Sequence, residues 1–276
     1  MENNLIWDKW LVAGRQIQYG KFSHFEYEEQ ADQRLLTAPL LHATIERHHS
    51  YSASWMRLLR TIGFHSLSET LLGNSKANLP VKTTPSKKGD GEEELTTRRG
   101  NFCEVLAAEY AVTKMGFEVP IRRLRYNPNP DQAMKGDDVL GFRFSSTNQA
   151  NEVLVGESKY RKNPSKAGEA VEKAYFSVYS PTKIVPVSLN FVATILELEK
   201  DLKRAQSVRQ IRAQLESGQI PVGRHYLIFL GTLGRPKNPF QWLDQQSNVE
   251  SNITCVNIVF ADGIQDWLNK LFDGGL

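Results

Sequence analysis

This chain has few cysteines, a small net charge and no extended apolar segment. Its 276 residues include two cysteines, Cys103 and Cys255, and both lie in apolar runs. We therefore expect two reduced thiols in the core rather than a disulfide or a zinc site. The net charge of +3 is too small to diagnose nucleic-acid binding by itself. No apolar run approaches the roughly 20 residues that a membrane-spanning helix needs, so no membrane association is expected.

Targeting and nucleotide-binding signals are also missing. The first ten residues contain no basic region followed by an apolar stretch, which is the pattern of a secretory signal peptide. The glycine-containing turn at 231–235 has neither the Lys-Ser/Thr of a phosphate loop nor Gly-x-Gly-x-x-Gly spacing. His42, His48 and His49 lack metal-site spacing, and we expect them on a surface or partly buried helix. We therefore predict a cytoplasmic protein that does not itself bind nucleotide.

The composition favours a packed, folded protein. Apolar residues make up 40% of the chain and charged residues 24%, which excludes global disorder. Helical and strand-like patterns alternate without an internal repeat. This order predicts an α/β (α+β) fold with a central mixed β-sheet flanked by helices.

Apolar spacing indicates where the elements lie. Helical periodicity is found at 35–41, 55–64, 98–112, 166–179 and 191–215, and in a terminal helix from 264. Strand patterns are found at 117–124, 139–144, 152–160, 226–230 and 253–260. The second and third of these strands are expected to form a hairpin, and Gly116 and Gly218 are expected to end the helices before them.

Two regions follow from a change in composition. Residues 1–95 are a mixed N-terminal region whose role is open, and 73–97 is rich in turn formers and charge, as expected of a linker or loop. Residues 98–276 carry the regular pattern, and we predict that they form the functional domain.

One group of residues carries chemical information. Side chains alternate along a strand, so Glu157 and Lys159 point to one side while Ser158 points to the other. Asp138 lies at the mouth of the partner strand, and a hairpin would bring it near Glu157. Two close carboxylates repel each other unless a cation lies between them, and oxygen ligands of this type suit Mg²⁺. Glu104, on the preceding helix, would complete or tune the metal shell.

The Lys159 ammonium would orient a metal-activated water or stabilise charge on a phosphate. A bare Glu-x-Lys is common by chance, but here the buried run Val-Leu-Val-Gly leads into Glu157. Arg161 and Lys162 leave the same strand and are the best candidates for DNA contacts. Arg98-Arg99 and Arg122-Arg123-x-Arg125 frame this region and fit equally a phosphate-contacting surface or a solvated face.

These motifs resemble a known family. Asp138…Glu157-Ser158-Lys159, after a helix with Glu104, resembles the PD-(D/E)xK nuclease core. Gly-Glu-Ser-Lys-Tyr at 156–160, with Lys-Gly-Asp-Asp at 135–138, is similar to the HamA-like nucleases of Hachiman anti-phage systems. The resemblance covers about 98–180. The motif's proline is absent, and Asp137 competes with Asp138 as ligand; we prefer Asp138 because it directly precedes an apolar strand.

The resemblance implies a restriction-endonuclease-like core at 98–276 that cuts DNA with Mg²⁺, or with Mn²⁺ as a substitute. It also implies a role in bacterial defence together with a helicase-like ATPase, which we expect to restrain the enzyme through residues 1–95. Two alternatives share these residues. One is a non-catalytic module of nuclease-like fold that binds DNA or a partner, and the other is a restriction or repair nuclease outside defence.

Overall fold

One mixed β-sheet organises the molecule. The computed structural model describes residues 5–15, 19–49, 92–126, 136–179, 185–218, 222–247, 249 and 252–273. Within these ranges a six-stranded sheet has the order β1-β2-β6-β5-β4-β3. The strands are β1 (Leu11–Ala13), β2 (Ser23–Glu29), β3 (Val139–Phe144), β4 (Ala150–Arg161), β5 (Gly223–Leu233) and β6 (Ile253–Phe260). This confirms the predicted α/β class with a central mixed sheet.

The strand pairing combines a hairpin with parallel crossovers. β3 and β4 are antiparallel and are joined by the turn at 145–149, as predicted. β4, β5, β6 and β2 are parallel neighbours, and β1 pairs antiparallel with β2 at one edge. β3 therefore forms the other edge of the sheet, where Asp138 enters.

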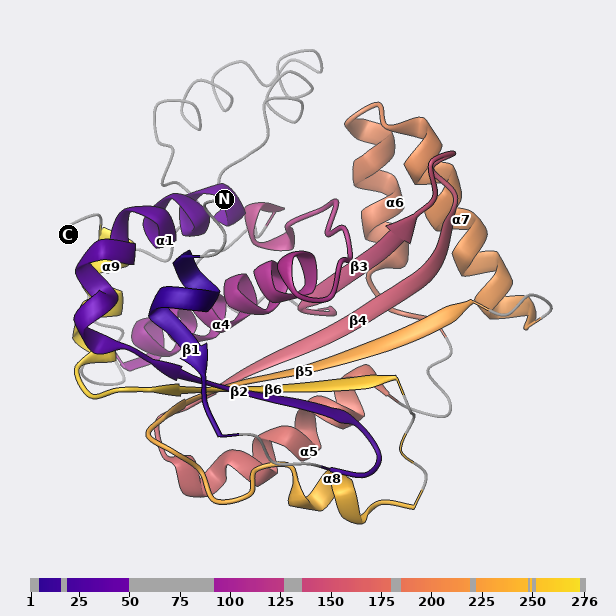
Figure 1. The fold of residues 1–276 in the computed structure, drawn as a ribbon. Coiled ribbons are helices and arrows are strands. Elements are labelled where there is room, and N and C mark those ends of the chain that lie inside the picture. Colours follow the sequence, from indigo (N-terminus) through magenta and orange to yellow (C-terminus); the bar gives the residue numbers. More distant parts are fainter. Residues whose placement is uncertain are drawn as a thin grey trace.

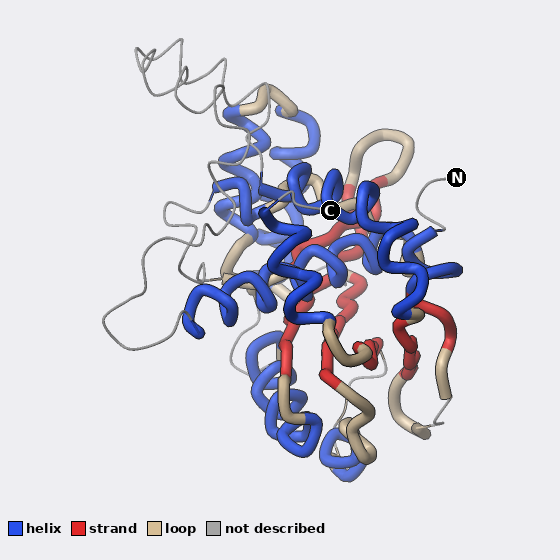
Figure 2. Tube along the Cα trace, turned by 90° about the vertical axis from the view of Figure 1, so that its left-hand side faces the viewer, coloured by secondary structure: helices blue, strands red, loops and turns tan. Residues whose placement is uncertain are grey.

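Helices cover both faces of the sheet (Figures 1 and 2). One face carries α1 (Arg34–His49), α4 (Glu92–Thr113) and α9 (Ile264–Asp273), and the other carries α5 (Ala167–Val178) and α8 (Gln241–Gln245). The pair α6 (Leu189–Leu198) and α7 (Leu202–Ser217) lies at the end of the sheet near the β3–β4 turn. Short helical segments are η1 (Ile6–Trp10), η2 (Ala31–Gln33), η3 (Arg123–Tyr126) and η4 (Pro164–Lys166).

The alternation of side chains along β4 divides the apolar core into two layers. Leu154 packs with α1, α4 and α9 on one side, while Val153 and Val155 pack with α5, α6 and α7 on the other. Cys103 lies in the first layer and Cys255 in the second; both are buried and free, which confirms the predicted core thiols. Burial of these apolar side chains supplies the main driving force for folding.

The described N-terminal elements belong to this same sheet and core. β2 lies between β1 and β6, and Trp10 and Leu11 are fully buried against the layer that contains α4. The boundary placed near residue 95 therefore marks no break in packing. The expected linker is wrong at 92–97, which belong to α4, while its remainder at 73–91 and the expected helix at 55–64 lie outside the described residues.

Two element predictions are wrong. Residues 117–124 form no strand: they make one isolated bridge between Glu118 and Phe142, because Pro120 has no N–H to donate and the chain then turns into η3. The single helix expected at 191–215 is two helices, broken at Lys200 with φ +65°. Asp201 accepts a hydrogen bond from the Arg204 N–H at 3.3 Å and so starts α7 afresh.

The ends of two helices follow the predicted glycine chemistry. Gly116 adopts φ +71° after α4 and Gly218 adopts φ +64° at the end of α7, both in the left-handed region that favours glycine. The three histidines lie on α1, a partly buried helix as expected; His48 and His49 are on its buried side, and His42 is partly exposed. Among the helices of the described ranges, none combines the length and the apolar character that a membrane crossing requires.

Candidate functional site

Asp138 is positioned by the open end of the β3–β4 ladder. β3 begins at Val139, opposite Gly156, so the Ser158 N–H two residues further along β4 has no β3 residue opposite it. The Asp138 carboxylate takes this place: its Oδ2 accepts from the Ser158 N–H at 2.8 Å and from Ser158 Oγ at 2.9 Å. The sheet edge therefore fixes one side of the carboxylate, as a side chain does when it caps unpaired backbone.

Glu104 reaches the same edge because α4 packs unusually close to the sheet. A Cβ on Gly231 of β5 would lie 2.7 Å from Cys103 Sγ, so only glycine allows this approach. Glu104, the next residue on α4, is buried beside the start of β3. This placement agrees with the expectation that the helix contributes a carboxylate to the group.

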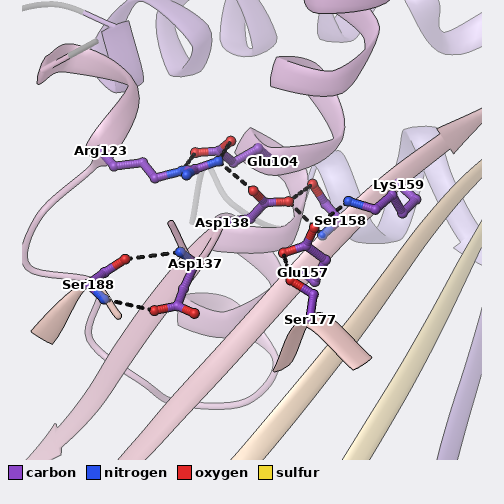
Figure 3. A network of polar contacts seen from close by, with 9 residues as sticks. All are labelled: Glu104, Arg123, Asp137, Asp138, Glu157, Ser158, Lys159, Ser177 and Ser188. Atoms are coloured by element: carbon purple, nitrogen blue, oxygen red, sulfur yellow. Dashed lines mark hydrogen bonds and ion pairs between the residues drawn. The ribbon is translucent and has the colours of Figure 1, made fainter. Parts of the chain in front are cut away.

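Arg123 joins the two carboxylates (Figure 3). Its Nε donates to Glu104 Oε1 at 2.7 Å and its Nη2 donates to Glu104 Oε2 at 2.8 Å. The same Nη2 also forms an ion pair with Asp138 Oδ1. The guanidinium thus lies between Glu104 and Asp138, a bidentate geometry that is among the stronger side-chain interactions in proteins.

Glu157 and Lys159 point to the face of β4 opposite to that of Ser158, as the alternation of side chains along a strand predicts. Lys159 Nζ forms an ion pair with Glu157 Oε1, and Ser177 Oγ on α5 donates to Glu157 Oε2 at 3.0 Å. Asp137 turns away from this group: its Oδ2 accepts from the Ser188 N–H at 3.0 Å, at the start of α6. The geometry therefore agrees with the preference for Asp138 over Asp137, because only Asp138 faces the other carboxylates of the site.

A single cavity of about 510 Å³ collects the predicted residues. Its lining includes Thr97, Arg99, Gly100, Asn101, Glu104, Arg123, Gly136, Asp138, Glu157, Ser158, Lys159, Tyr160, Arg161 and Lys162. All six side chains singled out from the sequence as catalytic, metal-binding or DNA-binding are among them, whereas Asp137 is not. The cavity volume is in the range of ordinary ligand sites. The chemical roles of the six residues stay predictions.

Comparison with known proteins gives the family. The sequence model of the HamA family matches residues 22–260. The chain belongs to the HamA family. It is 40% identical over 184 residues to the Hachiman protein HamA of Bacillus cereus, a stretch that is 64% of this chain and 60% of that protein. The chain thus spans less than two thirds of that relative's length, and the family match extends well beyond residues 98–180.

Burial and crowding of like charge shape the electrostatics of this HamA-family site. Burial raises the pKa of Glu104 to about 7; Arg123 opposes this, and the charges of Asp138 and Glu157 add to it. Burial also raises the pKa of Glu157, together with the charge of Asp138, against the opposing effects of Lys159 and Ser177. The close approach of three carboxylates therefore disfavours the charged form of Glu104 and of Glu157.

Two positively charged side chains contact these carboxylates. Burial alone would lower the pKa of Arg123, but the attraction of Glu104, Asp138 and Glu157 raises it overall, so the guanidinium stays charged. Lys159 supplies the second positive charge next to Glu157. Arg123 and Lys159 thus contact the three carboxylates directly, while Arg99, Arg161 and Lys162 add positive charge elsewhere in the cavity lining.

The donor set fits a hard divalent cation in its chemistry, since Mg²⁺ prefers carboxylate oxygens. The positions of these carboxylates in the structure, however, are not those of a metal site. Among the residues that the structure describes, no three histidine, cysteine, aspartate or glutamate side chains lie close enough together to hold a metal ion. Arg123 lies between Glu104 and Asp138, and Lys159 binds Glu157. Asp138, Glu157 and Glu104 are the residues that would hold the ion once the guanidinium withdraws.

The structure departs from the sequence interpretation of these arginines at Arg98, Arg123 and Arg125, but not at Arg99. Arg98 is buried and pairs with Asp273 at 2.7 Å, and Arg125 donates to the Arg47 carbonyl at 2.9 Å, so neither lies free on a solvated or phosphate-contacting face. Arg123 faces carboxylates rather than solvent, and of these arginines Arg99 and Arg123 line the cavity. Sequence reasoning missed the contacts of Arg123, because they join a loop to a helix and leave no local spacing.

Proposed function

We propose that this HamA-family chain is a metal-dependent DNA nuclease. The observation that carries the proposal is the gathering of Glu104, Asp138, Glu157 and Lys159 around one cavity with basic residues in its lining. Carboxylates and an ammonium at one sheet edge are the parts that phosphodiester hydrolysis needs. Membership of the PD-(D/E)xK superfamily, with its restriction-endonuclease-like core, is part of the same proposal.

Asp138 and Glu157 hold Mg²⁺, or Mn²⁺ in its place, and Glu104 assists from α4. When bound, the ion polarises a phosphoryl oxygen and lowers the pKa of a water. The protein's part is orientation. Ser158 holds Asp138 Oδ2 against β4, and Ser177 holds Glu157 Oε2 at 3.0 Å, so both carboxylates face the cavity in fixed rotamers.

Lys159 acts on the reacting phosphate. Its ammonium lies beside Glu157 on the face of β4 that leads into the cavity. From there it positions the attacking water or stabilises the charge that develops on the phosphate oxygens. Arg161 and Lys162 follow on the same strand end and contact the DNA backbone, with Arg99 beside them in the cavity lining.

The cellular role follows the family. The curated relative is named as a Hachiman protein. We propose that the present chain is the effector of a bacterial anti-phage system, acts in the cytoplasm and works with a helicase-like ATPase that restrains it. A restriction or repair nuclease would use the same chemistry and differ only in its partner.

A second function is favoured by one observation. Because Arg123 fills the space between Glu104 and Asp138, the chain could instead be a non-catalytic module that binds DNA or a partner with a nuclease-like fold. Such a module would need no metal. Binding of divalent metal to the full chain therefore separates the two functions.

The test combines calorimetry with cleavage. The full chain is titrated with Mg²⁺ and incubated with linear, nicked and single-stranded DNA in Mg²⁺, in Mn²⁺ or in EDTA. We expect metal-linked heat, cutting of at least one DNA form with either metal, and none in EDTA. Absence of heat together with intact DNA in all three forms would favour the binding module.

A further inference from the structure

Arg123 occupies the position that a cation would take between two of the proposed metal ligands. It engages both oxygens of Glu104, at 2.7 and 2.8 Å, and the Oδ1 of Asp138. The side chains of Arg123, Glu104 and Asp138 are exposed by only 11%, 8% and 12%. A guanidinium so enclosed is a fixed part of the site rather than a passing surface contact.

A metal ion and a guanidinium that bind the same oxygens repel each other. Asp138 Oδ2 is already engaged by Ser158, so Oδ1 is the oxygen left to face a metal, and it is the one that Arg123 binds. Both Glu104 oxygens are taken as well. A divalent ion that uses Asp138 Oδ1 or Glu104 would therefore lie close to the positive charge of the guanidinium, so the two cations compete for these carboxylates.

The chain segment that carries Arg123 is fastened to the N-terminal helix. Arg122 Nε lies 3.3 Å from His48 Nε2, and Arg125 donates to the Arg47 carbonyl at 2.9 Å. Arg47 and His48 also meet Glu109 of α4, at 2.9 and 2.8 Å. Arg123 is thus the first residue of η3 and lies between Arg122 and Arg125, which both contact α1. These contacts fix the position of the Arg123 backbone.

We propose that Arg123 is a built-in counter-cation that competes with the divalent metal for Glu104 and Asp138, and that α1 holds it in place through Arg122 and Arg125. The inference rests on the proposed function, because it assumes that these carboxylates bind metal. Its consequence is a linkage: metal and guanidinium each weaken the binding of the other. The enzyme then binds metal more weakly than its carboxylates alone would allow.

The linkage predicts that removing the charge of Arg123 lowers the stability of the metal-free protein and raises its affinity for metal. Arg123→Gln keeps a polar side chain of similar reach but removes the positive charge. Without added metal the variant leaves Glu104 and Asp138 uncompensated, so its Tm falls. With metal it has no competitor, so its affinity for Mn²⁺ rises on the order of tenfold, a usual size for coupling between competing ligands. Arg123→Lys keeps the positive charge but cannot form the bidentate contact with Glu104. Its Tm and its affinity for Mn²⁺ should therefore lie between those of the wild type and of Arg123→Gln.

Calorimetry with Mn²⁺ on the full chain tests this, with melting curves in EDTA and in saturating Mn²⁺. The matched control is Arg212→Gln, which removes an exposed arginine paired with Glu216 on α7. Tighter Mn²⁺ binding by Arg123→Gln, a lower Tm in EDTA and recovery of that Tm by Mn²⁺ would support the exchange. Equal or weaker binding by a folded Arg123→Gln variant would overturn it.

A second measurement uses the wild-type chain and so does not depend on the variant folding. The arginine Nε–H signal of Arg123, assigned with Arg123→Lys, should lose protection from hydrogen exchange when Mg²⁺ is added. Unchanged protection at saturating Mg²⁺ would overturn the inference. If wild type binds metal and cuts DNA while Arg123→Gln binds metal equally, only this inference fails. If neither protein binds metal, the proposed function fails with it.

Discussion

The Asp138 carboxylate has two oxygens with different partners, and this difference governs what the residue can do. Oδ2 is held by the Ser158 N–H and hydroxyl at 2.8 and 2.9 Å, and Oδ1 faces the Arg123 guanidinium. The first contact belongs to the sheet edge and remains as long as β4 is folded. The second is an ion pair between side chains and is the one that can be exchanged.

Single residues also show which part of the site is predictable from sequence. Alternation along β4 is enough to predict that Glu157 and Lys159 share a face, because the side-chain period of a strand is fixed. The same rule gives the opposite direction for Ser158. Arg123 and Ser177 are not predictable in this way, since each meets its carboxylate only after a helix has packed on the sheet.

Arg161 and Lys162 carry a prediction about DNA affinity. Each phosphate contact releases counterions, so Arg161→Gln and Lys162→Gln should each lower the salt slope of DNA binding by about one. Fluorescence anisotropy with a short labelled duplex in Ca²⁺, across a series of NaCl concentrations, measures the slope. Lys173→Gln, an exposed change on α5, is the control. Slopes equal to wild type in both variants would remove these residues from the interface.

At the scale of elements, α1 combines two buried histidines with the contacts that fix the loop of Arg123. His48 Nε2 lies 2.8 Å from Glu109 Oε1, and His49 Nδ1 lies 2.8 Å from the Ile45 carbonyl. Burial lowers the pKa of His48 to about 4; Glu109 opposes this, and the nearby Arg122 and Arg47 reinforce it. Burial likewise lowers the pKa of His49 to about 4.

These two histidines predict how stability depends on pH. Their folded pKa of about 4 is below the ordinary 6.5, so between these values the unfolded chain binds more protons than the folded one. The contribution of these histidines to the free energy of unfolding should therefore fall as the pH decreases from 6.5 toward 4. Urea denaturation at several pH values measures this. The double variant His48→Gln/His49→Gln should show a shallower fall, and an equally steep one would contradict the assignment.

Elements with clear local signals were the predictable ones. The strand expected at 253–260 matches β6 because a β-branched, apolar run is bounded by polar residues on both sides. Residues 117–124 alternate in burial as a strand would, yet Pro120 and the early turn into η3 prevent pairing beyond one bridge. The break at Lys200 is equally hidden, since the apolar stripe continues across it.

At the scale of the whole molecule, the N-terminal segment is structural. β2 separates β1 from β6, and Glu29 at its end binds Arg34 of α1 and the Ala261 N–H beyond β6. The sequence leaves the role of residues 1–95 open, because β1 and β2 are short and lie far from β6 in the chain, so nothing in the sequence shows that they join its sheet. Any contact with a restraining partner through this region must use surfaces that the sheet leaves uncovered.

Truncation tests this integration. A chain that begins at residue 92 lacks β1, β2 and α1, and so exposes the edge of β6 and the core rings that Trp10 covers, which are Phe102, Phe260 and Trp267. We expect it to lose cooperative thermal unfolding and to aggregate. Circular dichroism melts and size-exclusion chromatography measure this against the full chain. A soluble truncated protein with the Tm of the full chain would show that the N-terminal elements are dispensable.

Cleavage by site variants tests the central claim most directly. The full chain, Glu157→Gln and Lys159→Met are compared on plasmid DNA in Mg²⁺, beside Glu216→Gln and Lys173→Met as exposed controls of the same chemistry. We predict that wild type and both controls cut, while each site variant keeps its circular dichroism spectrum and loses roughly 100-fold or more in rate. Undiminished cutting by either folded site variant would contradict the account.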